Sequence, residues 1–271
     1  MLRQWLGVVS LLKRELECLK MKVLCYGGGT NTTAMIVGLA ARNIRPDLII
    51  MADTGAERPH TYAHIEIMQE FLRMIEFPKI TIVKKVDKNG EVLTLEDDLI
   101  KNKALPSVAY GFKTCSQKYK TQPVDKFLNN HPDAIAAWKR GERITKFIGF
   151  DADESHRAKD YDDSKYKVEY PLIEWGWGRD ECIDEIRKEN LPLPSKSSCF
   201  FCPNMRPHEI MELNALYPHL AERALKIESN AELTTIKGLG RRFAWSDLLR
   251  QTSMFNDMYE SSMPCGCYDG D

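Results

Sequence analysis

Residues 21–33, MKVLCYGGGTNTT, decide the fold of this chain. The apolar run at 21–26 has the length and composition of a buried strand, and three glycines, Gly27, Gly28 and Gly29, end it. Apolar residues at helical spacing follow at 32–42. A buried strand, a glycine turn and a helix in this order predict the first unit of a parallel α/β sheet.

The same alternation continues along the chain. The further predicted strands are 47–52, 79–83 and 146–150, with an amphipathic helix at 60–75 between the first two. This order predicts an α/β fold with a parallel sheet, helices on both faces and right-handed crossovers. Beyond about residue 165 helical patterns dominate, at 179–189, 206–229 and 242–259. We expect three parts: an N-terminal helix or extension at 1–20, an α/β domain at 21–165, and a helical, cysteine-containing part with a tail at 166–271.

Composition excludes several classes of protein. The chain has 271 residues, 38 Lys and Arg against 39 Asp and Glu, and a net charge of −1. This balance argues against a protein that coats nucleic acid by bulk charge, although a local basic patch remains open. No apolar run approaches the roughly 20 residues that span a bilayer. Because no targeting signal is recognisable, we expect a cytoplasmic protein without membrane contact.

The glycine turn has the chemistry of an anion site. Glycine lets the backbone turn sharply and approach a ligand closely. The N–H groups of the turn and of the following helix N-terminus then face one point, which suits a phosphate. Four small polar residues, Thr30, Asn31, Thr32 and Thr33, can cap the helix and donate to phosphate oxygens. The alternative is a plain strand-to-helix turn.

Five ordered segments resemble one enzyme family. YGGGTNTTAM at 26–35 resembles the PP-loop, S-G-G-x-D-S, of the adenine nucleotide alpha hydrolase-like superfamily. MADTGAERPHTY, TCSQKYKTQPV, GFDADESHRA and YPLIEWGWGRDECIDEIRKENLPLP are similar to successive segments of phosphoadenosine phosphosulfate (PAPS) reductases. The resemblance covers about residues 21–230. It implies a nucleotide-binding α/β domain at 21–165 that takes ATP or PAPS, with Mg²⁺ as a further ligand.

The resemblance also implies roles for single residues. The nucleotide would bind at Gly27, Gly28, Gly29, Thr30, Asn31, Thr32, Asp53 and Lys118, and the catalytic residues would be Asn31, Glu154, Arg157 and Cys265. Asp53 would hold the ribose or a metal, with Glu57 nearby, and Arg157 would face phosphate or sulfate oxygens. Four positions depart from the pattern: Gly27, Asn31 and Thr32 stand where the loop has Ser, Asp and Ser, and Asp151 stands where the family has Arg. Nucleotide binding is therefore a safer expectation than pyrophosphate cleavage.

Cysteines form the second constellation. Cys199 and Cys202 make a C-x-x-C motif, a spacing that lets two thiolates reach one metal. Cys115 and a tail cysteine, Cys265, would complete four ligands for a [4Fe–4S] cluster or, alternatively, Zn²⁺. A different role for Cys265 is that of a nucleophile, with Cys267 resolving the intermediate. The aromatic residues Trp175, Trp177, Phe200 and Phe201 predict either a platform for a base or core packing.

Three functions stay open on these patterns. The leading interpretation is ATP-dependent sulfur transfer to a nucleic acid (DNA or tRNA) or another acceptor beside a cysteine-bound cluster. The second is a sulfonucleotide reductase that uses Cys265. The third is a non-catalytic module that binds a nucleotide or nucleic acid. The expected partners are an adenine nucleotide, the acceptor, a thioredoxin-like protein or a cysteine desulfurase, and a second copy of the chain.

Overall fold

The computed structural model describes residues 20–159, 163–233 and 235–251. The chain divides into two compact units. We call Met1–Val92 with Lys118–Ser197 the sheet unit, and Leu93–Gln117 with Ser198–Asp271 the cysteine unit. Apart from Lys20, the N-terminal helix or extension expected at 1–20 lies outside the described residues.

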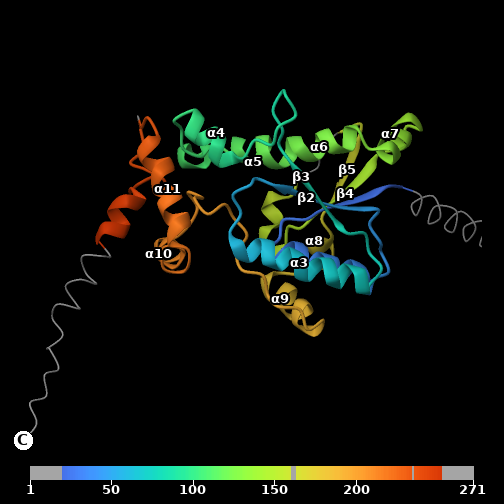
Figure 1. The fold of residues 1–271 in the computed structure, drawn as a ribbon. Coiled ribbons are helices and arrows are strands. Elements are labelled where there is room, and N and C mark those ends of the chain that lie inside the picture. Colours follow the sequence, from blue (N-terminus) through green and yellow to red (C-terminus); the bar gives the residue numbers. More distant parts are fainter. Residues whose placement is uncertain (1–19, 160–162, 234, 252–271) are drawn as a thin grey trace, which may run out of the picture. The chain divides into compact units, whose positions relative to one another are not determined.

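A five-stranded parallel sheet forms the sheet unit (Figure 1). Its order is β3-β2-β1-β4-β5, and every neighbouring pair is parallel. The strands are β1 Lys22–Cys25, β2 Leu48–Asp53, β3 Ile80–Lys84, β4 Ile144–Ile148 and β5 Tyr166–Glu169. The predicted α/β class is confirmed. β1 is central, with β2 on one side and β4 on the other, so the strand order reverses direction at β1.

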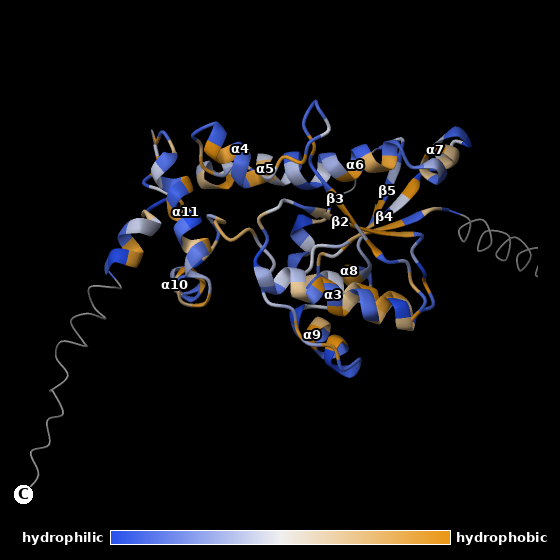
Figure 2. Ribbon diagram, in the orientation of Figure 1, coloured by the Kyte–Doolittle hydropathy of each residue, from blue (hydrophilic) through white to orange (hydrophobic). Residues whose placement is uncertain are grey.

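Helices cover both faces of the sheet. On one face lie α2 Thr30–Ala41, α3 Pro59–Met74, α8 Pro171–Glu174 and α9 Arg179–Lys188, which share a core with strand residues such as Leu24. On the other face lie α6 Gln122–Asn129 and α7 Pro132–Lys139, which pack with residues such as Val23. Because both faces are covered, the three strands β1, β2 and β3 are mainly apolar, and Figure 2 shows much of the sheet in the hydrophobic colour.

The fifth strand and the first helices after residue 165 belong to the sheet unit. β5 pairs with β4 from Ile144↔Tyr166 to Phe147↔Glu169. α8 and α9 follow, and α9 packs against α2. Two tight helical turns complete this unit, the π-helical η2 Gln117–Thr121 at its boundary and the 3-10 helix η3 Ala152–Arg157 after β4.

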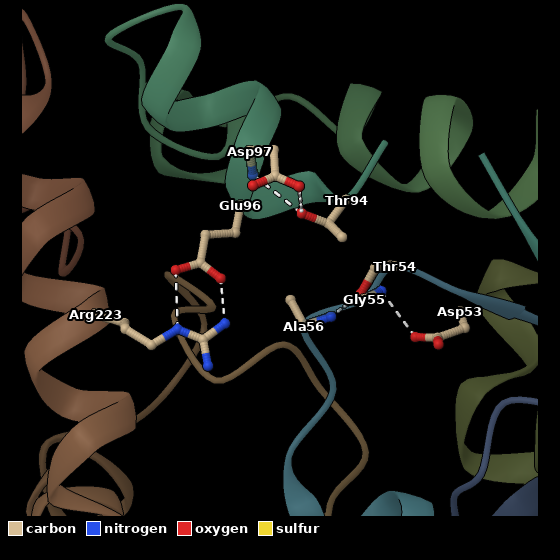
Figure 3. A network of polar contacts seen from close by, with 8 residues as sticks. All are labelled: Asp53, Thr54, Gly55, Ala56, Thr94, Glu96, Asp97 and Arg223. Atoms are coloured by element: carbon tan, nitrogen blue, oxygen red, sulfur yellow. Dashed lines mark hydrogen bonds and ion pairs between the residues drawn. The ribbon is translucent and has the colours of Figure 1, made fainter. Parts of the chain in front are cut away.

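The cysteine unit is helical. It contains α4 Leu95–Lys101, η1 Ser107–Tyr110, α5 Thr114–Ser116, α10 Pro207–Leu216, α11 Pro218–Asn230 and helical residues 245–251. The pattern at 206–229 forms two helices, because Pro218 cannot continue α10 and instead occupies the first position of α11. An ion pair between Arg223 and Glu96 joins α11 to α4 (Figure 3).

One buried carboxylate organises the end of the cysteine unit. Glu228 is 6% exposed and accepts hydrogen bonds from three backbone N–H groups. The donors are Leu239 at 2.8 Å, Trp245 at 2.8 Å and Ser246 at 3.0 Å. The carboxylate therefore ties the loop at 238–240 and the start of helical residues 245–251 to α11. Within the described ranges, none of the helices is long and apolar enough to cross a membrane.

Candidate functional site

The glycine loop joins β1 to α2 at the carboxyl edge of the sheet. Gly28 has φ +70°, and a Cβ there would lie 2.9 Å from Cγ2 of Thr61, so both conformation and space require glycine. Gly29 is the N-cap of α2 and offers no side-chain cap. The Thr32 hydroxyl closes the loop on itself, accepting from Gly27 N–H at 3.3 Å and donating to the Gly29 carbonyl at 3.2 Å. The loop thus has a fixed shape and an uncapped helix start behind it.

A buried hydrogen-bond network on the core side of this loop holds it in place. The Thr33 hydroxyl lies 3.4 Å from the Tyr26 hydroxyl and 3.2 Å from Nε2 of His64. All three residues are buried, and they come from the end of β1, from α2 and from α3. Burial lowers the pKa of His64, so the imidazole is held in its neutral form. The Thr33 hydroxyl therefore stabilises the loop through contacts with protein groups. The Thr30 side chain is also buried, at 5% exposed.

Asn31 is the hub of the site. Its Nδ2 donates to Oδ2 of Asp151 at 2.9 Å and to Oε2 of Glu154 at 3.4 Å. Its Oδ1 accepts from Nη1 of Arg179 at 3.2 Å. Asn31 and Asp151, which depart from the family pattern in two different segments, are therefore in direct contact. A neutral amide suits this place, because an Asp at position 31 would face two other carboxylates.

Arg179 brings the start of α9 to the glycine loop. Its backbone N–H donates to Oδ2 of Asp153 at 3.0 Å, while its side chain reaches Asn31. Arg179 is exposed, so the guanidinium is accessible to an anionic ligand. The sequence reasoning missed this residue, because nothing in the pattern RDEC marks one arginine among several charges.

The turn after β4 carries two more of the four predicted catalytic residues, Glu154 and Arg157. Asp151 is 4% exposed and caps η3 by accepting from Glu154 N–H at 3.0 Å. Glu154 forms an ion pair with Arg157. The Arg157 guanidinium lies 4.2 Å from the ring centroid of Phe150, which in turn stacks on Tyr170 with centroids 5.7 Å apart. Glu154 is thus shared between Asn31 and Arg157, and the fold gathers all three predicted residues.

Asp53, the predicted ribose or metal residue, is fully engaged by protein groups. Its Oδ1 accepts from Gly55 N–H at 2.8 Å, a bond visible in Figure 3, and from the Tyr62 hydroxyl at 2.8 Å. Its Oδ2 pairs with Nζ of Lys84 at 3.3 Å. Burial, followed by the bond to Asp53, raises the pKa of Tyr62 and keeps it protonated as a donor. Asp53 therefore shapes the turn after β2.

Lys118 and Lys120 both lie on η2 but differ in their surroundings. The Lys118 side chain is exposed. Lys120 instead reaches Glu57, with Nζ 3.2 Å from Oε1. Glu57 is 4% exposed and follows Asp53 by four residues. The role of Lys118 in nucleotide binding stays a prediction, and Lys120 is the lysine that contacts the strand-end loop.

The far end of α2 is held as firmly as its start. The Arg42 guanidinium lies 4.1 Å from the ring centroid of Trp175 and 5.0 Å from that of Trp177, and it donates to the Gly38 carbonyl at 3.2 Å. The two indoles pack edge to face against each other, with ring centroids 5.0 Å apart, and both lie against the core of the sheet unit. In the cysteine unit, Phe200 and Phe201 are 1% and 0% exposed. The aromatic residues thus serve as packing in each unit.

The cysteine loops are ordered by local turns. Cys202 N–H donates to the Cys199 carbonyl at 3.0 Å, so both thiols of the C-x-x-C motif lie on one tight turn. Cys115 N–H donates to the Ser107 hydroxyl at 3.0 Å. Over the described part of the chain, no group of three or more His, Cys, Asp or Glu side chains is placed to hold a metal. Cys265 and Cys267 lie outside the described residues.

The remaining two cysteines of the described ranges are structural. Cys25 lies in β1 and Cys182 in α9. Burial raises the pKa of the Cys25 thiol, and burial together with nearby Asp151 raises the pKa of Cys182 to about 12. Thiols held protonated in this way are poor nucleophiles and poor metal ligands.

Comparisons with known proteins concern the fold. No protein-family model matches the chain, and no curated protein matches its sequence. Phosphoadenylyl-sulfate (PAPS) reductase from Candida auris, solved as a phosphate complex, is similar at 14% identity and TM-score 0.41, over 68% of this chain and 80% of that chain. The U34-tRNA thiolase NcsA from Methanococcus maripaludis, solved with its [4Fe–4S] cluster, is similar at 15% identity and TM-score 0.44, over 86% and 81%. At these identities, function must be argued from this chain's own residues.

Proposed function

We propose that this chain is a PP-loop enzyme that binds an adenine nucleotide at the glycine loop and carries out ATP-dependent sulfur transfer. One observation carries the proposal: Asn31, after β1, bonds to Asp151, after β4. These strands are neighbours at the point where the sheet order reverses. In open α/β sheets, ligands bind in the crevice outside the carboxyl ends of strands at this point.

The charges at the crevice suit a polyphosphate. The N–H groups of the glycine loop and the start of α2 supply partial positive charge, and the guanidinium groups of Arg179 and Arg157 supply full charges. Asp151 and Glu154 are the carboxylates within reach of the loop through Asn31. A magnesium ion that arrives with the nucleotide would compete with the Asn31 amide for these two groups.

The cysteine unit would supply the sulfur chemistry. The turn closed by the Cys202 N–H to Cys199 carbonyl bond carries both thiols of the C-x-x-C motif, and the proposed set adds Cys115 and Cys265. Among the described residues the thiols do not gather into a complete site. When bound, a [4Fe–4S] cluster or Zn²⁺ would hold or activate sulfur. A nucleic acid is the proposed acceptor, with a thioredoxin-like protein or a cysteine desulfurase as a partner.

Nucleotide binding gives the first test. Calorimetry with ATP and with PAPS should give saturable binding to the full-length protein. Replacing Asn31 with Ala should weaken that binding by about tenfold, since Asp151 and Glu154 lose the amide that holds them away from the phosphates. Asn89→Ala, in the exposed turn after β3, is the matched control and should bind as the wild type does. Absence of binding to any adenine nucleotide would refute the proposal.

Metal content gives the second test. Protein purified without oxygen should contain iron and acid-labile sulfide, and the Cys199→Ser/Cys202→Ser protein should lose both. Cys182→Ser is the control, because that thiol is buried in α9. If the protein contained one equivalent of zinc and no iron, the proposed cluster would be wrong and the cysteines would hold a structural zinc ion. Release of sulfite from PAPS that depends on Cys265 would instead assign the reductase activity.

A further inference from the structure

The turn after β2 and the start of α3 contain three buried polar atoms for which no described residue supplies a hydrogen-bond partner. They are Oε2 of Glu57, Nε of Arg58 and Oγ1 of Thr61. The three residues are 4%, 5% and 1% exposed. Buried polar groups in folded proteins are nearly always paired, so three orphans within five residues require an explanation. Asp53 offers the contrast, because both of its oxygens are bonded to protein groups.

Thr61 lies against the glycine loop. Cγ2 of Thr61 is 2.9 Å from where a Cβ of Gly28 would stand, so the first turn of α3 touches the loop. The second oxygen of Glu57 is bound by Nζ of Lys120 at 3.2 Å, and the Lys120 side chain is 43% exposed. A terminal nitrogen of Arg58 donates to the Lys196 carbonyl. A ligand entering from solvent past Lys120 would therefore meet groups that are already held in place.

The three orphans define the chemistry of a matching ligand group. The carboxylate oxygen accepts, the guanidinium Nε donates, and the threonine hydroxyl does either. A sugar hydroxyl pair can donate to the first and accept from the others. A phosphate cannot donate, and it would place negative charge against the buried Glu57 carboxylate. An acidic residue after the second strand is also the usual partner of a ribose hydroxyl in dinucleotide-binding α/β folds.

We infer that Glu57, supported by Arg58 and Thr61, binds the ribose hydroxyls of the nucleotide, the role that the sequence pattern assigned to Asp53. The site then selects a nucleotide with an unmodified ribose, such as ATP, over one with a 3′-phosphate, such as PAPS. This inference rests on the proposed nucleotide binding and names the specificity of that same site.

The test compares ribose analogues on the full-length protein. Wild-type protein should bind ATP at least about tenfold more tightly than 2′-deoxyATP or 3′-deoxyATP, and more tightly than PAPS, because a hydrogen bond to a buried carboxylate is lost. Glu57→Gln should weaken ATP binding by about tenfold. It should also reduce the ratio between the affinity for ATP and the affinities for the deoxy analogues. Thr61→Val should have a smaller effect in the same direction.

Two control variants isolate the inference. Glu66→Gln, on the exposed side of α3, should bind ATP and its analogues as the wild type does. Asp53→Asn should destabilise the fold but keep the ratio between ATP and its deoxy analogues. A wild-type protein that binds ATP and both deoxy forms equally overturns the inference while leaving nucleotide binding intact, and this outcome needs no variant to fold. Absence of binding to every adenine nucleotide overturns the proposed function as well.

Discussion

In the sheet unit, Asn31 contacts Asp151 and Arg179, which lie 120 and 148 residues away in the sequence. In the cysteine unit, the bond that shapes the C-x-x-C loop spans three residues, and the bond at Cys115 spans eight. The first geometry exists only when the whole sheet has formed. The second can form from a short piece of chain, as tight turns do.

This difference separates two ways of building a site. The glycine-loop site is held by side chains from distant elements, so its shape is fixed before a ligand arrives. The cysteine loops are locally ordered, but bringing them into one metal site requires further interactions. We therefore expect the nucleotide site to be sensitive to single substitutions, and the cysteine unit to depend on the few contacts that tie its loops together.

Replacing Gly28 with Val should break the sheet-unit site most severely. Valine is strained at φ +70°, and its Cβ would meet Thr61 at 2.9 Å. We expect ATP affinity, measured by calorimetry, to fall by more than about 100-fold. The matched control is Gly90→Val, which also has positive φ but has nothing within 4 Å of the new Cβ. If both variants bind ATP like the wild type, the loop is not the phosphate site.

Replacing Glu228 with Gln probes the cysteine unit at its buried carboxylate. The carboxylate accepts three backbone N–H bonds, and the amide would present an NH₂ group to at least one of them. We expect the local free energy of opening to fall by about 2 kcal/mol. Hydrogen exchange at Leu239, Trp245 and Ser246 should accelerate accordingly. Glu222→Gln, exposed on the same helix, should leave these rates unchanged; equal acceleration would contradict the assignment.

Replacing Asn31 with Asp tests the long-range contact between Asn31 and Asp151 that distinguishes the sheet unit from the cysteine unit. The new carboxylate would face Asp151 and Glu154, and the repulsion should reduce ATP affinity by about tenfold in the absence of magnesium. Adding Asp151→Asn to the same chain should recover most of that loss, because the opposite amide restores the hydrogen bond. Binding measured across the four proteins of this double-mutant cycle gives the coupling. Additive effects would show that the contact has no energetic consequence.

The pH dependence of stability should give the smallest effect. Burial lowers the pKa of His64 in the folded state below its ordinary value of 6.5. The unfolded chain therefore takes up a proton more readily, so stability is full above about pH 6.5 and falls as the pH decreases below it. The slope is at most about 1.4 kcal/mol per pH unit. Urea titrations of wild-type and His64→Gln protein at several pH values from 7 to 5 give the free energy of unfolding at each pH. If this free energy changes equally with pH in both proteins, the assignment to His64 is refuted.

Much of the sheet could be predicted from local patterns. Runs such as 47–52 and 79–83 are apolar because their strands are covered on both faces, and glycines mark where the first strand ends. β5 was missed because YKVE is four residues long and half charged, so only its pairing with β4 makes it a strand. Its placement brings α8 and α9 into the sheet unit, which no local pattern indicates.

The candidate site divides in the same way. Gly28 and the turn after β4 carry local signals, and the fold brings Asn31, Glu154 and Arg157 together, while their catalytic roles stay a prediction. Arg179 carries no local signal, because its contact with Asn31 depends on how α9 packs on α2. Glu57 and Asp53 could not be told apart in the sequence, since only the structure shows which carboxylate is already bonded.

The contact of the Arg42 guanidinium with the rings of Trp175 and Trp177 has a thermodynamic consequence for the opposite end of α2. A helix that is immobilised at its last turn, and supported at its first by Tyr26, Thr33 and His64, has little freedom left to lose. Binding of an anion at its N-terminus therefore carries a small conformational entropy penalty. Arg42→Ala would remove the contacts that restrain the last turn of α2, so the entropy penalty of anion binding would increase. Position 42 does not contact the ligand, because it lies about 18 Å from the start of the helix at ~1.5 Å per residue.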